Sequence, residues 1–164
     1  MIEPAPNLFL SCYARRGLKN SIFCNACVPF DYTDEFVDMK YSDSMTISKS
    51  LDLDIADLPA HTLDSKRHMS ERECIFEFGA KSATLTELLV KANSPQLIDF
   101  LSLDIEGAEL DVLKGLDFEK YNFKYMVIEC RDIKKLRVYL EKYDYALLEK
   151  ITLHDYLFKY EKWT

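Results

Sequence analysis

Three carboxylates lie close together in a setting that could do chemistry. The stretch from Ile98 to Gly115 reads IDFLSLDIEGAELDVLKG and carries Asp104, Glu106 and Glu109. A carboxylate can take a proton from a hydroxyl, orient a substrate or bind a hard cation through its oxygens. Two structural roles are also open. Glu109 would be stabilised in the first turn of a helix, and Glu106 could be an N-terminal cap.

The elements on either side predict where these carboxylates stand. Residues Ile98 to Asp104 are mostly apolar and have the length of a strand buried on both faces. From Ala108 the apolar residues recur at helical spacing, and Lys114 and Gly115 mark the end of that helix. A buried strand that runs into a helix is half of a βαβ unit. In such sheets ligands bind beyond the carboxyl ends of the strands.

A second apolar strand follows the first. It runs from Tyr125 to Cys130 and contains Glu129 near its end, which makes Glu129 a further candidate at the same edge of the sheet. Asp132 is expected to start the next helix. Tyr145 to Ile151 and His154 to Tyr160 then predict two antiparallel strands joined by a tight turn.

The N-terminal part predicts a strand end, a helix and another strand. Met1 to Glu3 is typical of the last residues of a strand, and Pro4 and Pro6 turn the chain into a helix that stops at Gly17. Ile22 to Val28 is expected to be the next strand.

The middle of the chain is more polar. Val37 to Ile47 alternates as a short hairpin would, and Lys49 to Glu73 is a long connection, typical of a functional loop, a lid or a disordered segment. Cys74 to Phe78 predicts a short strand. Thr84 to Glu87 has the form of a capping box at a helix start.

Bulk composition bounds the function. A chain of 164 residues fits one domain over residues 1–164, and a net charge of −7 argues against a nucleic-acid partner. No run of apolar residues is long enough to span a bilayer and no signal segment opens the chain, so a soluble, cytoplasmic protein without a membrane partner is expected.

The cysteines do not suggest a disulfide framework. The chain has five, an odd number at uneven spacing. Cys24 and Cys27 have C-x-x-C spacing but fall inside an expected strand, where residues three apart point to opposite faces. Buried structural cysteines are therefore favoured over a redox or zinc site.

The acidic turn resembles the D-x-E-G-x-E signature of the FkbM-type, S-adenosylmethionine-dependent methyltransferases. The resemblance extends in order from Ile2-Glu3-Pro4 to the strand that contains Glu129. It implies an α/β fold with a Rossmann-like class I methyltransferase sheet. It also implies methyl transfer from S-adenosylmethionine to a hydroxyl of a small-molecule or carbohydrate acceptor.

The resemblance also implies roles for individual residues. Glu3 matches the acidic residue that bonds the ribose hydroxyls of the cofactor, and Asn25 and Ala26 match a turn that lies along the adenine ring. Asp104 matches the position of a base or orienting group at the end of a strand. Two more catalytic candidates follow from chemistry and position rather than from the resemblance. Glu106 could orient the acceptor hydroxyl or share a metal with Asp104, and Glu129 stands at the end of the adjacent strand.

One hallmark of the family is missing. Its glycine-rich loop follows the first strand, but none of the four glycines here forms a G-x-G pair or follows a strand upstream of Glu3. The expected sheet therefore lacks its first strand and first helix. Residues upstream of Met1 are the favoured explanation. Re-pairing of the strands and a partner chain that fills the gap are the others.

Two other classes of function stay open. The chain could be a non-catalytic remnant or binding module that kept the core and lost the cofactor loop. The acidic cluster could instead be a metal-dependent hydrolytic site on an unrelated α/β fold. That reading needs further ligands near Asp104, and His154 is the evident candidate.

Overall fold

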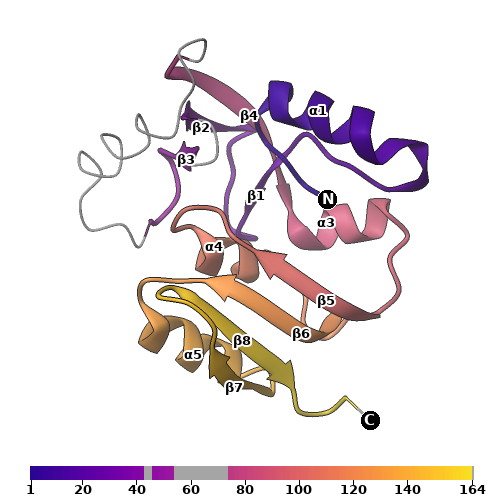
Figure 1. Ribbon diagram of the computed structural model, residues 1–164, viewed down its shortest axis with the longest axis vertical. Helices are drawn as coiled ribbons and strands as arrows, with labels where there is room; N and C mark the ends of the chain where they lie inside the picture. Colours follow the sequence, from indigo (N-terminus) through magenta and orange to yellow (C-terminus); the bar gives the residue numbers. More distant parts are fainter. Residues whose placement is uncertain (43–45, 54–73, 164) are drawn as a thin grey trace.

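The part of the chain that the structure describes forms two four-stranded mixed sheets, with helices α3 and α4 between them (Figure 1). The structure is a computed structural model that describes residues 1–42, 46–53 and 74–163. In chain order its elements are α1 (Pro6–Arg16), η1 (Gly17–Lys19), β1 (Ala26–Val28), β2 (Phe36–Tyr41), β3 (Ile47–Ser48), β4 (Phe76–Thr84), α3 (Leu85–Lys91), β5 (Leu97–Leu103), α4 (Glu109–Lys114), β6 (Asn122–Glu129), α5 (Ile133–Glu141), β7 (Tyr145–Lys150) and β8 (Asp155–Tyr160).

The first sheet has the order β1-β4-β2-β3 and is built around the long strand β4. β1 runs parallel to β4, and β2 runs antiparallel to both β4 and β3. The predicted hairpin is confirmed in β2 and β3, although its residue Met45 lies outside the described residues, as do residues 54–73 of the long connection. β4 is much longer than the predicted strand because it continues through Gly79 to the helix cap at Thr84.

The N-terminal helix forms where the sequence predicts it. α1 begins at Pro6 and stops before Gly17, whose φ of 62° is easily reached only without a side chain. Ile2 forms an isolated parallel bridge with Phe23. The strand predicted over Ile22 to Val28 is wrong in extent, because only Ala26–Val28 continues into a sheet.

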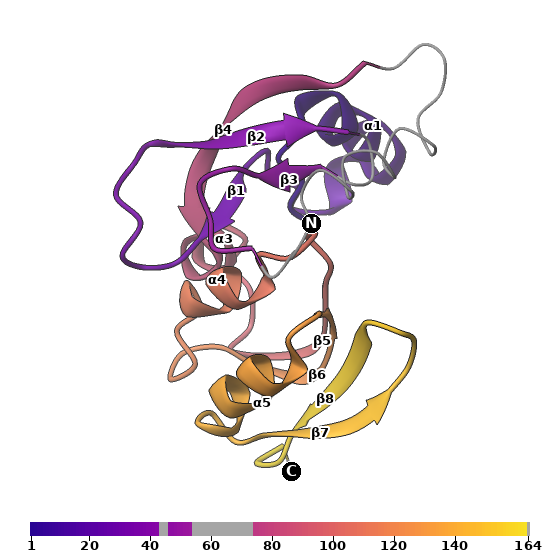
Figure 2. The ribbon, with the colours of Figure 1, turned by 90° about the vertical axis from the view of Figure 1, so that its left-hand side faces the viewer.

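The second sheet has the order β5-β6-β8-β7. β5 and β6 are parallel, and β8 is antiparallel to both β6 and β7, which confirms the predicted closing pair. α5 lies along one face of this sheet (Figure 2), where its residues Leu136 and Leu140 are buried. Asp132 caps α5 as expected, since its side chain accepts a hydrogen bond from the Lys135 N–H.

β5 corrects one prediction. The sequence predicts a strand buried on both faces, but Leu97 is 57 % exposed and Phe100 is 53 % exposed. The reason is that β5 is the outer strand of its sheet, with β6 as its strand neighbour. Leu103 is the residue of β5 that is fully buried.

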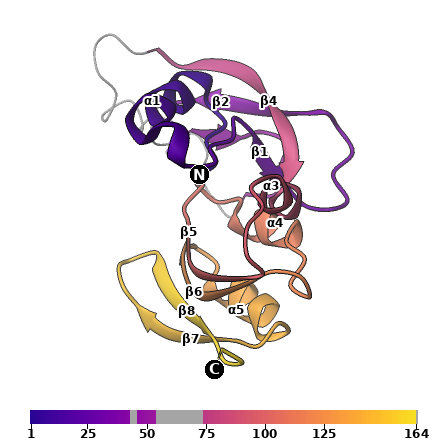
Figure 3. The same ribbon diagram turned by 90° about the vertical axis from the view of Figure 1, so that its right-hand side faces the viewer.

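Helix α4 lies between the two sheets, which form the two halves of the molecule (Figure 3). Its end lies so close to β1 that a Cβ on Gly115 would come within 2.1 Å of the Val28 carbonyl oxygen. Asp111 of α4 is buried, and its Oδ2 accepts a hydrogen bond of 3.0 Å from the Asp52 N–H, in the segment that follows β3. The larger apolar core lies around the second sheet, and Ile2 and Cys27 pack against it from the first half of the chain.

The α/β class is therefore confirmed. The described elements form two mixed sheets rather than one continuous parallel sheet. No helix among the described residues is both long enough and apolar enough to cross a bilayer.

Candidate active site

The acidic turn between β5 and α4 is held in shape by Glu109. Its Oε1 accepts hydrogen bonds from the backbone N–H groups of Ile105 at 2.9 Å and Gly107 at 3.1 Å, and its side chain is buried. Gly107 has a φ of 101°, a conformation that favours glycine. Glu109 lies in the first turn of α4, as the sequence predicts, and its bonds to the turn are a structural role that the sequence does not predict. The N-cap of α4 is Ala108, so Glu106 does not cap that helix.

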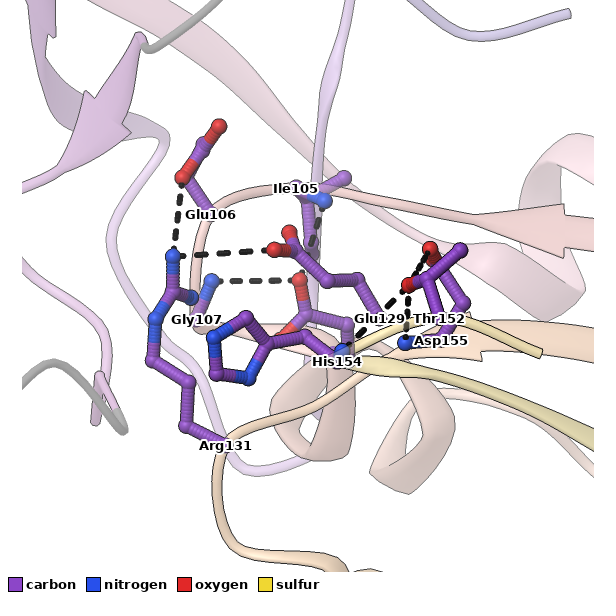
Figure 4. Close-up of polar contacts among 9 residues, drawn as sticks. Ile105, Glu106, Gly107, Glu129, Arg131, Thr152, His154 and Asp155 are labelled. Carbon is purple, nitrogen blue, oxygen red and sulfur yellow. Dashed lines mark hydrogen bonds and ion pairs between the residues drawn. The ribbon is translucent and has the colours of Figure 1, made fainter. Parts of the chain in front are cut away.

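Glu106 itself stands in an unusual conformation. Its φ of 57° lies in the left-handed region, which costs energy for a residue with a side chain. The turn carries its carboxylate toward the residues that follow β6, where it forms an ion pair with Arg131 (Figure 4). Strain of this kind persists where the surrounding structure holds it.

Two further carboxylates meet at the carboxyl ends of β5 and β6. The parallel pairing aligns Leu103 with Ile128, and the next residues along the two strands are Asp104 and Glu129. Oxygens of Asp104, Glu109 and Glu129 all lie within 4.8 Å of one another. The structure therefore brings Asp104 and Glu129 together, as the parallel strands predict.

Asp104 and Glu129 differ in their surroundings. Asp104 is exposed, whereas Glu129 is partly buried. Burial is the main cause that raises the pKa of Glu129 to about 8, the hydrogen bond and charge of Asp104 raise it further, and Arg131 opposes the shift. Glu129 Oε2 is buried and has no hydrogen-bond partner among the described residues.

Arg131 is a site residue that the sequence analysis missed. Its Nη2 lies 3.3 Å from Glu106 Oε2 and 3.6 Å from Glu129 Oε1, so one guanidinium nitrogen bridges the turn after β5 and the end of β6 (Figure 4). The sequence held no local signal for this bridge, because it joins the turn after β5 to a residue that follows β6.

His154 comes from the turn between β7 and β8. Its backbone oxygen accepts a hydrogen bond of 2.8 Å from the Cys130 N–H, which places this turn beside the end of β6. Within the turn the His154 N–H donates a hydrogen bond of 3.3 Å to Thr152 Oγ1 (Figure 4). Within the described residues, the carboxylate cluster that could hold a cation consists of Asp104, Glu109 and Glu129, without a histidine.

The three residues assigned to the cofactor lie in the first half of the chain. Glu3 Oε1 accepts a hydrogen bond of 2.8 Å from the Ala5 N–H, which fixes the carboxylate at the start of α1. Asn25 donates its Nδ2–H to the Lys81 carbonyl of β4 at 3.1 Å. Ala26 is buried as the first residue of β1, so the turn predicted at this position is wrong.

The cysteines are all free thiols. Cys24 Sγ lies 3.8 Å from the Pro4 carbonyl oxygen, and Cys27 packs against the larger core from β1. Burial raises the pKa of the Cys27 thiol to about 12, which opposes the thiolate form needed for redox exchange or zinc binding.

The comparison with protein families identifies the class. Residues 1–147 match the model of the methyltransferase FkbM domain, so the chain belongs to that family. Comparisons with curated proteins and with solved structures found no match.

Proposed function

We propose that this chain is an S-adenosylmethionine-dependent methyltransferase whose acceptor is a hydroxyl of a small molecule or a sugar. The observation that carries the proposal is the pair of carboxyls, Asp104 and Glu129, at the carboxyl ends of two neighbouring parallel strands in an FkbM-family domain. We also propose that the fold is a Rossmann-like methyltransferase fold. The strand order β5-β6-β8-β7 of the second sheet and the parallel bridge at Ile2 support this assignment.

The cofactor supplies an electrophilic methyl group on a sulfonium. Transfer breaks the sulfur–carbon bond and forms an oxygen–carbon bond, so the acceptor hydroxyl must lose its proton. Asp104 is exposed and therefore accessible to an acceptor. The pair formed by Asp104 and Glu129 takes the proton, and Glu106 orients the acceptor hydroxyl.

The residues of the first half fit the cofactor in part. Glu3 is a fixed carboxylate, which suits two ribose hydroxyls because each of its oxygens can accept a hydrogen bond. Asn25 is partly exposed and stands next to β1, where it would lie against the adenine ring. The Ala26 side chain is buried in the smaller apolar core, so any contribution from Ala26 is through its backbone.

Calorimetric titration of S-adenosylmethionine into the protein tests the cofactor. We expect binding that Glu3→Ala weakens and that Glu161→Ala, at an exposed glutamate near the C-terminus, leaves unchanged. No binding would contradict the proposal and favour the non-catalytic remnant. Equal binding by Glu3→Ala would remove Glu3 from the site.

Transfer of a labelled methyl group to a panel of neutral hydroxylated acceptors tests the reaction. We expect Asp104→Asn and Glu129→Gln to lower the rate of transfer about 100-fold, as the loss of a general base does. The hydrolase alternative rests on the Asp104–Glu109–Glu129 cluster. It predicts hydrolytic activity that a chelator abolishes, whereas methyl transfer by the proposed route survives chelation.

A further inference from the structure

We infer that Arg131 is a positioning residue, which holds Glu106 and Glu129 toward each other across the acceptor site. The inference rests on the proposed function for its catalytic consequence, but its structural part can be tested separately. It assigns a role to a residue that carries no chemistry of its own in the transfer step.

The contacts of Arg131 join two separate segments of the chain. Glu106 stands in the turn that follows β5, and Glu129 is the last residue of β6. The side chains of Arg131, Glu106 and Glu129 are 26 %, 15 % and 17 % exposed, respectively. An ion pair shielded to this degree is screened less by water and salt than a surface pair, so its geometry constrains both carboxylates.

The turn needs an external support at Glu106. Glu109 fixes the backbone at Ile105 and Gly107 on either side of it. It leaves the Glu106 side chain to be held by other groups, and the backbone there adopts the left-handed conformation. Arg131 forms an ion pair with the Glu106 carboxylate while the turn has this strained shape.

The charge of the cluster gives the second reason. Asp104, Glu106, Glu109 and Glu129 bring four carboxyls to one end of the sheet. Burial and the charges of Asp104 and Glu106 raise the pKa of Glu129, and the Arg131 guanidinium, within 3.6 Å of oxygens of both Glu106 and Glu129, opposes that shift. Arg131 thereby sets the spacing of the groups that face the acceptor.

The test compares three variants. Arg131→Met removes the charge and keeps much of the length, Arg131→Lys keeps a cation, and Arg137→Met is a matched control. Arg137 pairs with Glu141 at 2.6 Å on the exposed surface of α5, away from the site. For Arg131→Met we expect kcat to fall on the order of 100-fold, as for a small misplacement of reacting groups. The Kd for S-adenosylmethionine should stay unchanged, Arg131→Lys should recover most of the rate, and Arg137→Met should match the wild type.

Hydrogen exchange provides a readout that does not depend on activity. The Gly107 amide is bonded to Glu109 inside the strained turn, so its exchange rate reports how often the turn opens. We expect Arg131→Met to speed exchange at Gly107 on the order of tenfold, with Arg131→Lys and Arg137→Met close to wild type. The amide of Met126, inside β6, serves as an internal reference for global stability.

The two readouts separate the possible failures. Unchanged exchange at Gly107 in Arg131→Met would overturn the positioning role, whatever the activity. If Arg131→Met exchanges faster at Gly107 but the wild type transfers no methyl group, the positioning role is supported and the proposed function is contradicted. A rate lost equally in Arg131→Met and Arg131→Lys, with exchange unchanged in both, would mean that Arg131 contacts the acceptor directly and would also overturn the inference.

Discussion

At the scale of single residues, the carboxyls of the acidic site have different contacts, although the sequence does not distinguish them. Glu109 closes a turn, Glu106 pairs with Arg131, and Asp104 and Glu129 share the edge of the sheet. The pairing of Asp104 with Glu129 was predictable, because parallel strands bring their carboxyl ends to one edge. The burial of Glu109 and the bridge made by Arg131 were not, since both depend on how the turn folds back.

The Glu129 carboxyl gives a prediction for stability against pH. Its pKa in the folded protein is about 8, above the value of an exposed glutamate, so the folded state binds this proton more tightly than the unfolded state. Its contribution to stability is therefore complete at acidic pH, below the unfolded pKa, and is lost as the pH rises through about 8. We expect the stability of wild type relative to Glu129→Gln to decrease between pH 5 and pH 8.

Urea denaturation at several pH values measures this difference. Glu161→Gln, at an exposed position, serves as the control and should follow the wild type throughout. Parallel stability curves for wild type and Glu129→Gln across the range would show that Glu129 keeps an ordinary pKa and would contradict the prediction.

At the scale of elements, the contact between α4 and β1 joins the two halves. The sequence predicts Gly115 as a helix stop, and α4 does end at Lys114. Gly115 is not required for a left-handed helix end, because its φ is −94°. It is required because the Val28 carbonyl oxygen leaves no room for a side chain. A contact with a residue so far away in the chain leaves no local signal.

Gly115→Ala tests this contact. The added Cβ would lie 2.1 Å from a backbone oxygen, which cannot rotate aside, so the helix and the strand must move apart. We expect a loss of about 2 kcal/mol or more in the free energy of unfolding. Gly79→Ala is the control, because its Cβ would meet Phe36 at an ordinary distance of 3.5 Å. Equal melting temperatures for the two variants would argue against a tight junction at Gly115.

At the scale of the whole molecule, β5 lies at an edge of the second sheet and is largely exposed. Strand edges with apolar side chains and few charges pair readily with other strands. Leu97 and Phe100 are more than half exposed, and Asp99 is the one charged residue within β5. This edge is therefore expected to promote association between molecules.

Phe100→Lys tests that expectation by placing a charge on the edge strand. We expect wild-type protein to form larger species as its concentration rises, and Phe100→Lys to form fewer of them. Phe30→Lys makes the same change at a similarly exposed phenylalanine outside the sheets and should behave as the wild type. Sedimentation velocity across a concentration series measures the difference. Identical profiles for wild type and Phe100→Lys would exclude β5 as the contact.

The sequence by itself determined the local elements and the family. Helix starts at Pro6 and Thr84, the acidic turn and the closing strand pair follow from signals within a few residues, because caps, turns and periodicity are local properties. The tertiary structure alone decided the division into two sheets, the exposure of β5 and the bridging role of Arg131. These depend on contacts between distant segments, whose free energies are settled only when the whole chain packs.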